Sequence, residues 1–256
     1  MDLADQIALI ANLLLELVLI VKLVWGRLHR IYLWFFIMLC FQALQSLGMM
    51  PLDRTKDLYG WAYFLSQPAL WLLYVLAVLE LYSLALRKHP GIASMSRWFM
   101  LGALLTSVVV SALTLSADLG QPGEKYPILA FFSVFERAVT FSLALLMLLI
   151  TGFLLWTPIS IRRNIVVHAS LYSVYFLASA AVLFLRNIQG YKLLDVVSIA
   201  RLSLNALCLL LWVLLLNKRG EEIVAVVRSR WQPADEVRLA RQMDAVNSFL
   251  LKSSGK

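Results

Sequence analysis

Glu136 and Arg137 stand side by side in the sequence FFSVFERAVTF (131–141), inside an apolar stretch long enough to cross a lipid bilayer. A charge at the bilayer centre costs about 2.5–3.5 kcal/mol on insertion scales, so such residues usually face the protein interior and often mark functional sites. Adjacent residues on a helix point about 100° apart, so these two side chains do not satisfy each other. Their partners must come from other helices at the same depth.

Other apolar stretches supply such partners. Arg201 and Asp195 lie in the first half of the last stretch, and Glu16 lies about ten residues into the first one. We predict a buried network in which Arg201 pairs with Glu136, and Arg137 pairs with Glu16 or Asp195. Amides at the same level complete the set of candidate ligand-binding or ion-pair residues: Gln42, Gln67 and Asn205.

Two interpretations of this network are open. The ion pairs either lock helices together or form a polar pocket for a small molecule or an ion that enters from outside. Histidines 29, 89 and 168 lack the spacing of a metal site, and no GxSxG, Walker A or CxxC motif is present. Residues 193–217 contain no lysine for a retinal Schiff base. We therefore expect no enzyme activity, no metal and no cofactor.

The elements that position these residues follow from composition. The 256 residues are 61% hydrophobic and 15% charged, whereas soluble domains carry about 25% charged residues. Stretches of about 20 apolar residues recur, and each can span about 30 Å as a helix. They predict an all-α, polytopic bundle of seven transmembrane helices, at about 6–25, 31–50, 59–86, 97–117, 127–156, 164–186 and 193–217.

Basic residues orient this bundle. The loops after the odd-numbered helices, with Lys22 and the start of the tail, carry ten Lys/Arg, against five in the other loops. Positive residues remain inside, which predicts an outside N-terminus and an inside C-terminus. The net charge of +8 suits an anionic lipid leaflet. We expect a multi-pass protein of the bacterial cytoplasmic (inner) membrane, with the lipid bilayer and not nucleic acid as its partner.

The chain divides into a bundle (1–218) and a cytoplasmic tail (219–256). Within the tail, the residue pattern predicts an amphipathic helix at about 233–251. Its apolar stripe consists of Leu239, Met243, Val246 and Leu250. Three roles for this helix are open: docking on the bundle, lying on lipid, or contacting a protein partner or a second copy.

Two segments carry a resemblance to a known family. With VLELYSLALRKHPGI (78–92) and the tail ARQMDAVNSFLLKSSGK (240–256), the chain resembles an uncharacterised family of bacterial seven-helix membrane proteins. The resemblance implies the seven-helix fold. It implies no activity and no functional residue.

Three functions fit these features. The first is a receptor-like or sensory protein whose ligand replaces internal ion pairs and moves helices near Pro68. The second is a small transporter or proton-coupled carrier with a 3+1+3 helix layout, using Glu16 and Glu136. The third is a structural or accessory subunit of a membrane complex, with the tail helix against its partner.

Overall fold

The computed structural model describes residues 3–52, 57–87, 127–156, 161–189, 194–222 and 224–225, with scattered residues of 98–109 and 238–252. The description leaves out the side chains of 3–6, 57–59, 127–134, 137, 153–156, 183–189, 194–198 and 224–225. The side chains of Arg137 and Asp195 and most of the predicted helix 97–117 therefore lie outside the described residues.

Six long helices fill the described part of the chain, and they confirm the predicted all-α class. They are α1 (Leu3–Trp25), α2 (Leu33–Met49), α3 (Asp57–Ala85), α5 (Pro127–Trp156), α6 (Arg163–Gln189) and α7 (Leu194–Leu215). Their bounds fall within three residues of the predicted ones, because uninterrupted apolar stretches set the length of each helix. α3 continues through Pro68.

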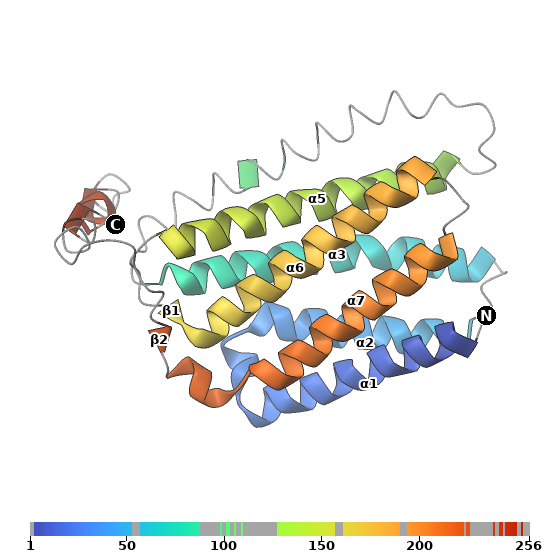
Figure 1. The fold of residues 1–256 in the computed structure, drawn as a ribbon, viewed down its shortest axis with the longest axis horizontal. Coiled ribbons are helices and arrows are strands. Elements are labelled where there is room, and N and C mark those ends of the chain that lie inside the picture. The colour runs from blue at the N-terminus through green and yellow to red at the C-terminus, as the bar shows by residue number, and fades with distance from the viewer. Residues whose placement is uncertain are drawn as a thin grey trace.

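The helices form one bundle with roughly aligned axes (Figure 1). α1 packs against α2 and α7, α3 packs against α2, α5 and α6, and α6 packs against α5 and α7. α1 and α3 begin at the end of the bundle where the N-terminus lies (Figure 1). We call this end the N-terminal end, and the other, where α1 ends, the opposite end.

Three of the described helices are long and apolar enough to cross a membrane: Ile7–Trp25, Gly60–Ala85 and Arg163–Val182. Three shorter apolar segments lie in the other helices: Leu33–Met49, Ala138–Gly152 and Ile199–Leu215. α1 is apolar on both faces, since Leu19 and Leu23 are fully buried while Leu14 and Val21 are 57% and 61% exposed. A helix that is apolar all round suits contact with lipid on its outer face.

Short elements close the opposite end of the bundle. A left-handed residue, Arg27 (φ 56°), follows α1 and leads into the 3-10 helix η1 (Leu28–Arg30). After α7 comes a second 3-10 helix, η3 (Lys218–Glu221). The strands β1 (Ile161–Arg162) and β2 (Val224–Ala225) pair antiparallel, with Ile161 opposite Ala225. The start of the tail is thereby tied to the start of α6.

The described residues of the tail are helical at 238, 241–242, 244–249 and 252. Of the predicted apolar stripe, Val246 is described and is 49% exposed, and Phe249 nearby is 70% exposed. Leu239, Met243 and Leu250 lie outside the described residues. The role of the tail helix therefore stays a prediction.

Candidate functional site

A buried ion pair joins α5 to α7. The Arg201 guanidinium lies 2.5 Å from the Glu136 carboxylate, which is the pairing that the sequence predicts. The Glu136 side chain is 4% exposed, whereas that of Arg201 is 32% exposed. The acid is therefore enclosed by protein, and the base keeps one side open to a cavity.

That cavity has a volume of about 360 Å³ and lies in the half of the bundle nearer the N-terminal end. Side chains from all six described long helices line it, so movement of any one of them changes its shape. Its polar lining residues are Glu16, Gln42, Gln45, Ser46, Tyr63, Gln67, Tyr74, Thr140, Tyr175, Ser179, Arg201 and Asn205.

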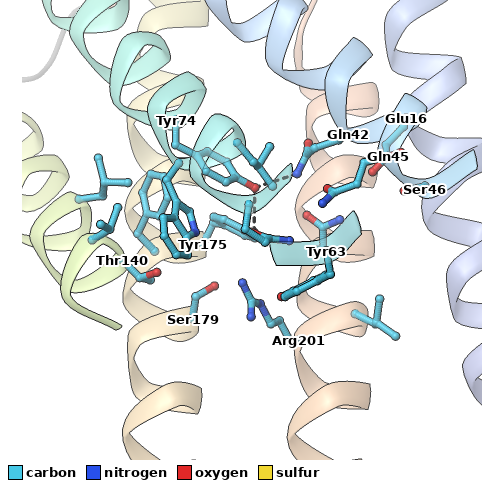
Figure 2. A pocket seen from close by; sticks show the side chains of 18 of the residues that line it. Glu16, Gln42, Gln45, Ser46, Tyr63, Tyr74, Thr140, Tyr175, Ser179 and Arg201 are labelled. Atoms are coloured by element: carbon cyan, nitrogen blue, oxygen red, sulfur yellow. Dashed lines mark hydrogen bonds between the residues drawn. The ribbon is translucent and has the colours of Figure 1, made fainter. Parts of the chain in front are cut away.

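Hydrogen bonds hold the wall of the cavity formed by α2, α3 and α6 (Figure 2). The Gln42 amide donates to the Tyr74 hydroxyl at 2.7 Å, and that hydroxyl lies 3.0 Å from the hydroxyl of Tyr175. The Gln45 amide donates to the Ser66 hydroxyl at 2.7 Å. These bonds fix the side chains in place before any ligand binds.

Glu16 lies on the side of the cavity formed by α1 and α2, across from Arg201 (Figure 2). The residue is 3% exposed and has Ser46 beside it. Its Oε2 atom has no hydrogen-bond partner among the described residues. A buried carboxylate oxygen without a partner costs free energy, so a hydrogen-bond donor from a ligand would be favourable at the Glu16 Oε2 atom.

Asparagines join α1 to α7 at the side of the cavity. The Asn205 amide donates to the Asn12 side-chain oxygen at 2.9 Å, and the Asn12 amide donates to the Leu202 carbonyl at 3.1 Å. Further along, the Lys22 ammonium donates to the Val213 carbonyl. Asn205 therefore lines the cavity and also holds α7 against α1 by a hydrogen bond.

The structure brings together most of the predicted site residues. Glu16, Gln42, Gln67, Arg201 and Asn205 all line the cavity, and Glu136 lies behind Arg201. The second predicted pair, Arg137 with Glu16 or Asp195, stays a prediction, because the side chains of Arg137 and Asp195 lie outside the described residues.

The site predicted from the sequence lacks two tyrosines of α3 that line the cavity, Tyr63 and Tyr74. Tyr63, Gln67, Leu70 and Tyr74 follow one another at i, i+4, i+7 and i+11 on α3, and all four line the cavity. This spacing places residues on one helix face, so Gln67 alone could have led to both tyrosines.

A layer of buried aromatic rings separates this cavity from the opposite end. Phe35 and His168 meet edge to face at 4.6 Å between ring centroids, and Tyr172 and Trp212 meet at 5.1 Å. Phe35 and Trp212 lie 5.2 Å apart. The His168 Nε2 and Trp212 Nε1 atoms have no hydrogen-bond partner among the described residues.

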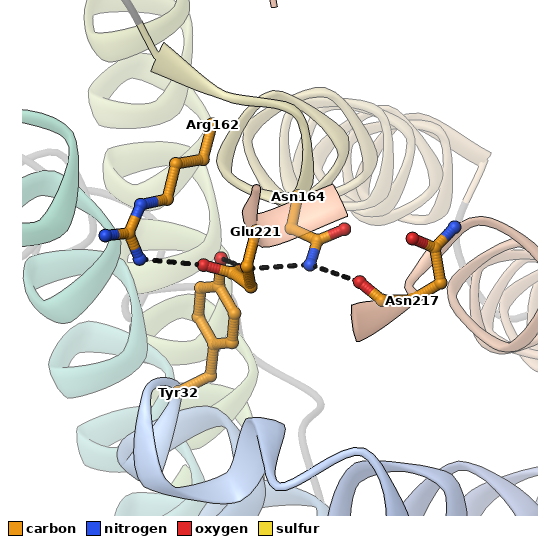
Figure 3. Close-up of polar contacts among 5 residues, drawn as sticks. All are labelled: Tyr32, Arg162, Asn164, Asn217 and Glu221. Carbon is orange, nitrogen blue, oxygen red and sulfur yellow. Dashed lines mark hydrogen bonds and ion pairs between the residues drawn. The ribbon is translucent and has the colours of Figure 1, made fainter. Parts of the chain in front are cut away.

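A second polar cluster lies at the opposite end, around Glu221 (Figure 3). Its carboxylate accepts hydrogen bonds from the Tyr32 hydroxyl at 2.6 Å and the Asn164 amide at 2.7 Å, and it pairs with Arg162 at 3.0 Å. The Asn164 amide also donates to the Asn217 carbonyl at 2.8 Å. Glu221 thus connects the start of α2, the start of α6 and the end of α7.

Two details show how tightly this Glu221 cluster is built. Burial and the neighbouring Glu221 raise the pKa of Tyr32, so its hydroxyl remains a donor at all physiological pH values. At Gly220 a Cβ atom would overlap the Asn164 side chain. Beside the cluster, Arg87 and Arg162 line a second cavity of about 420 Å³.

Glu80 closes the N-terminus of α2 from the neighbouring helix α3. Its two carboxylate oxygens accept hydrogen bonds from the backbone amides of Leu33 and Trp34 at 2.9 Å and of Phe35 at 3.4 Å. Tyr32, at the N-cap position, provides no side-chain cap. A carboxylate at this place both satisfies free amides and interacts favourably with the helix dipole.

No protein-family model, no curated protein and no solved structure shows a significant match to the chain. The family resemblance noted above therefore stays a prediction.

Proposed function

We propose that the chain is a seven-span protein of the bacterial cytoplasmic membrane, with its N-terminus outside and its C-terminus inside. Three helices of spanning length, three shorter apolar helices and the apolar stretch 97–117 support this number. The excess of Lys/Arg at the opposite end supports the orientation. In this arrangement the 360 Å³ cavity lies in the outer half of the membrane.

Within this topology we infer a receptor-like or sensory function. The observation that carries the inference is the cavity itself. It combines polar groups from six helices with an arginine whose ion pair reaches a buried acid on another helix. Convergent polar groups of this kind orient ligands in binding pockets. A ligand bound in the cavity contacts side chains of several helices at once, so it can shift these helices relative to one another, and a shift of helices is a signal.

The interior below the cavity favours a receptor over an open channel. On α2 the cavity ends at Gln42 and the second cavity begins at Tyr32, with Phe35, Met38 and Leu39 buried between them. Gln42 and Tyr32 are ten residues apart, so a packed layer of nearly three helical turns, about 15 Å, separates the two cavities. A signal crosses such a layer by movement of helices, without passage of the ligand.

Ligand-dependent stability tests this function. Purified protein is heated with separate panels of amino acids, amines, carboxylic acids, sugars and inorganic salts. We expect one class to raise Tm by at least about 5 °C at 100 times its Kd, because saturation at that level adds about 2.7 kcal/mol. The effect should disappear in Gln67→Leu, which changes the cavity lining, and persist in Gln242→Leu, which changes an exposed tail residue. The proposal fails if no class stabilises the protein or if both variants respond alike.

A carrier is the second candidate, since two cavities on either side of a closed layer also suit alternating access. Uptake of a stabilising compound into proteoliposomes distinguishes the two. A receptor binds the compound without accumulating it, whereas a carrier accumulates it at a rate that depends on Glu16 and Glu136.

A further inference from the structure

The charges of the described residues around the 360 Å³ cavity do not balance. Among its described lining residues, Arg201 is the one cation and Glu16 the one acid. Arg201 is already paired with Glu136, which lies behind it and is not part of the lining. Within the described part of the chain, the charged group that faces the cavity without an ionic partner is therefore Glu16, which is 3% exposed and whose Oε2 atom has no described hydrogen-bond partner.

Acceptors accompany this carboxylate. Gln42 and Gln45 donate their amide groups to the Tyr74 and Ser66 hydroxyls in the wall. The carboxamide oxygens of both residues are acceptors, and both residues line the cavity beside Glu16 (Figure 2). A ligand that presents N–H or O–H donors suits this side of the cavity better than one that presents lone pairs.

Aromatic rings of the cavity lining also favour a cation. Five of them line the cavity: Tyr63, Trp71, Tyr74, Tyr175 and Phe176. The faces of such rings attract ammonium groups, an interaction worth more when the cation is desolvated. An anion would gain no such attraction from the rings, and the charge of Arg201 is already compensated by Glu136.

We propose that the ligand of this cavity is a small organic amine or quaternary ammonium ion, held by the free carboxylate oxygen of Glu16 among the aromatic rings. This proposal rests on the ligand-binding function proposed above and names the chemical class of the ligand. A volume of about 360 Å³ is at the lower end of the range for ligand pockets, which fits a small molecule.

The test compares charged and uncharged compounds of equal shape. The full-length protein is kept in dodecyl maltoside and phosphate buffer, because amine buffers and phospholipid headgroups would compete. Thermal unfolding and titration calorimetry use choline and ethanolamine as cations, 3,3-dimethyl-1-butanol as the uncharged isostere of choline, and acetate and glycolate as anions. Each compound is tested on the wild type, Glu16→Gln and the matched control Glu222→Gln, which alters an exposed acid after η3.

We expect choline or ethanolamine to stabilise the wild type and Glu222→Gln, with affinity reduced at least tenfold in Glu16→Gln. The uncharged isostere should bind at least tenfold more weakly than choline to the wild type, a comparison that needs no variant. Equal binding of the isostere, or unchanged amine affinity in Glu16→Gln, overturns the assignment. If the anions alone stabilise the protein, the cavity binds ligands but the amine assignment is wrong. If nothing in the wider panels stabilises it, both proposals fail.

Discussion

At the scale of single residues, the ion pair of Glu136 and Arg201 is the contact of the bundle interior most sensitive to the loss of one partner. Glu136 is enclosed, and Arg201 is its partner among the described residues. Removing one member of a buried pair leaves an uncompensated charge, which destabilises a protein by about 3–5 kcal/mol. Replacing both members together loses much less, since no charge is then stranded.

We therefore predict that Glu136→Gln lowers the free energy of unfolding by about 3 kcal/mol, near the lower end because the cavity solvates Arg201 in part. The double variant Glu136→Gln/Arg201→Gln should lose less than the sum of the two single variants. Reversible unfolding in mixed micelles measures this coupling, with Glu222→Gln as the exposed control. Additive losses would show that the pair contributes nothing to stability.

At the scale of elements, helices α2 and α3 are joined by a cap that crosses between them. Glu80 of α3 accepts from three consecutive amides at the start of α2. The first amides of a helix have no partner within it, so they need an acceptor from elsewhere when they are shielded from water. This contact fixes how α2 begins relative to α3, and α2 and α3 together carry one wall of the cavity.

Glu80→Ala should destabilise the protein by about 2 kcal/mol, which is typical for the loss of hydrogen bonds to a charged acceptor. Glu80→Gln should lose about half as much, because one oxygen still accepts while the charge at the helix N-terminus is gone. Hydrogen exchange of the Leu33, Trp34 and Phe35 amides reports the cap directly. Their protection should fall in Glu80→Ala, while that of the α6 amides remains unchanged. Equal protection in the wild type and the variant would rule out the cap.

At the scale of the whole molecule, the two ends of the bundle carry different polar structures. The N-terminal end holds the cavity with Glu16 and Arg201. The opposite end holds the Glu221 cluster, which fastens the segment leading into the tail to the starts of α2 and α6 (Figure 3). Helices that span the distance between the ends can transmit a change in the cavity to the tail, provided that the two ends face opposite sides of the membrane.

That orientation is testable with single cysteines. The native Cys40 and Cys208 are replaced by Ala, and either Gln121→Cys or His89→Cys is introduced into a predicted loop. We expect an impermeant maleimide to label Gln121→Cys in intact cells and His89→Cys only after permeabilisation, because basic loops remain inside. The reverse pattern, or labelling of both in intact cells, would contradict the N-out, C-in topology.

The sequence by itself determined the elements. Each helix follows from a local property, a run of about 20 apolar residues, so the bounds of six helices were predicted to within three residues. The depth of each polar residue within its run is local as well. Residues such as Glu136 and Arg201 could therefore be matched across helices before their contact was observed.

Many polar residues lie at similar depths in their helices, so depth does not say which of them meet. Only the tertiary structure decided those partners. Tyr32 and Glu221 are 189 residues apart, and Asn12 and Asn205 are 193 apart. Glu80 lies near two basic residues in sequence, yet it bonds to the backbone of another helix. The rotation of each helix about its own axis selects these partners, and that rotation depends on how all the helices pack together. The cavity depends on the same rotations, because its lining comes from six helices at once.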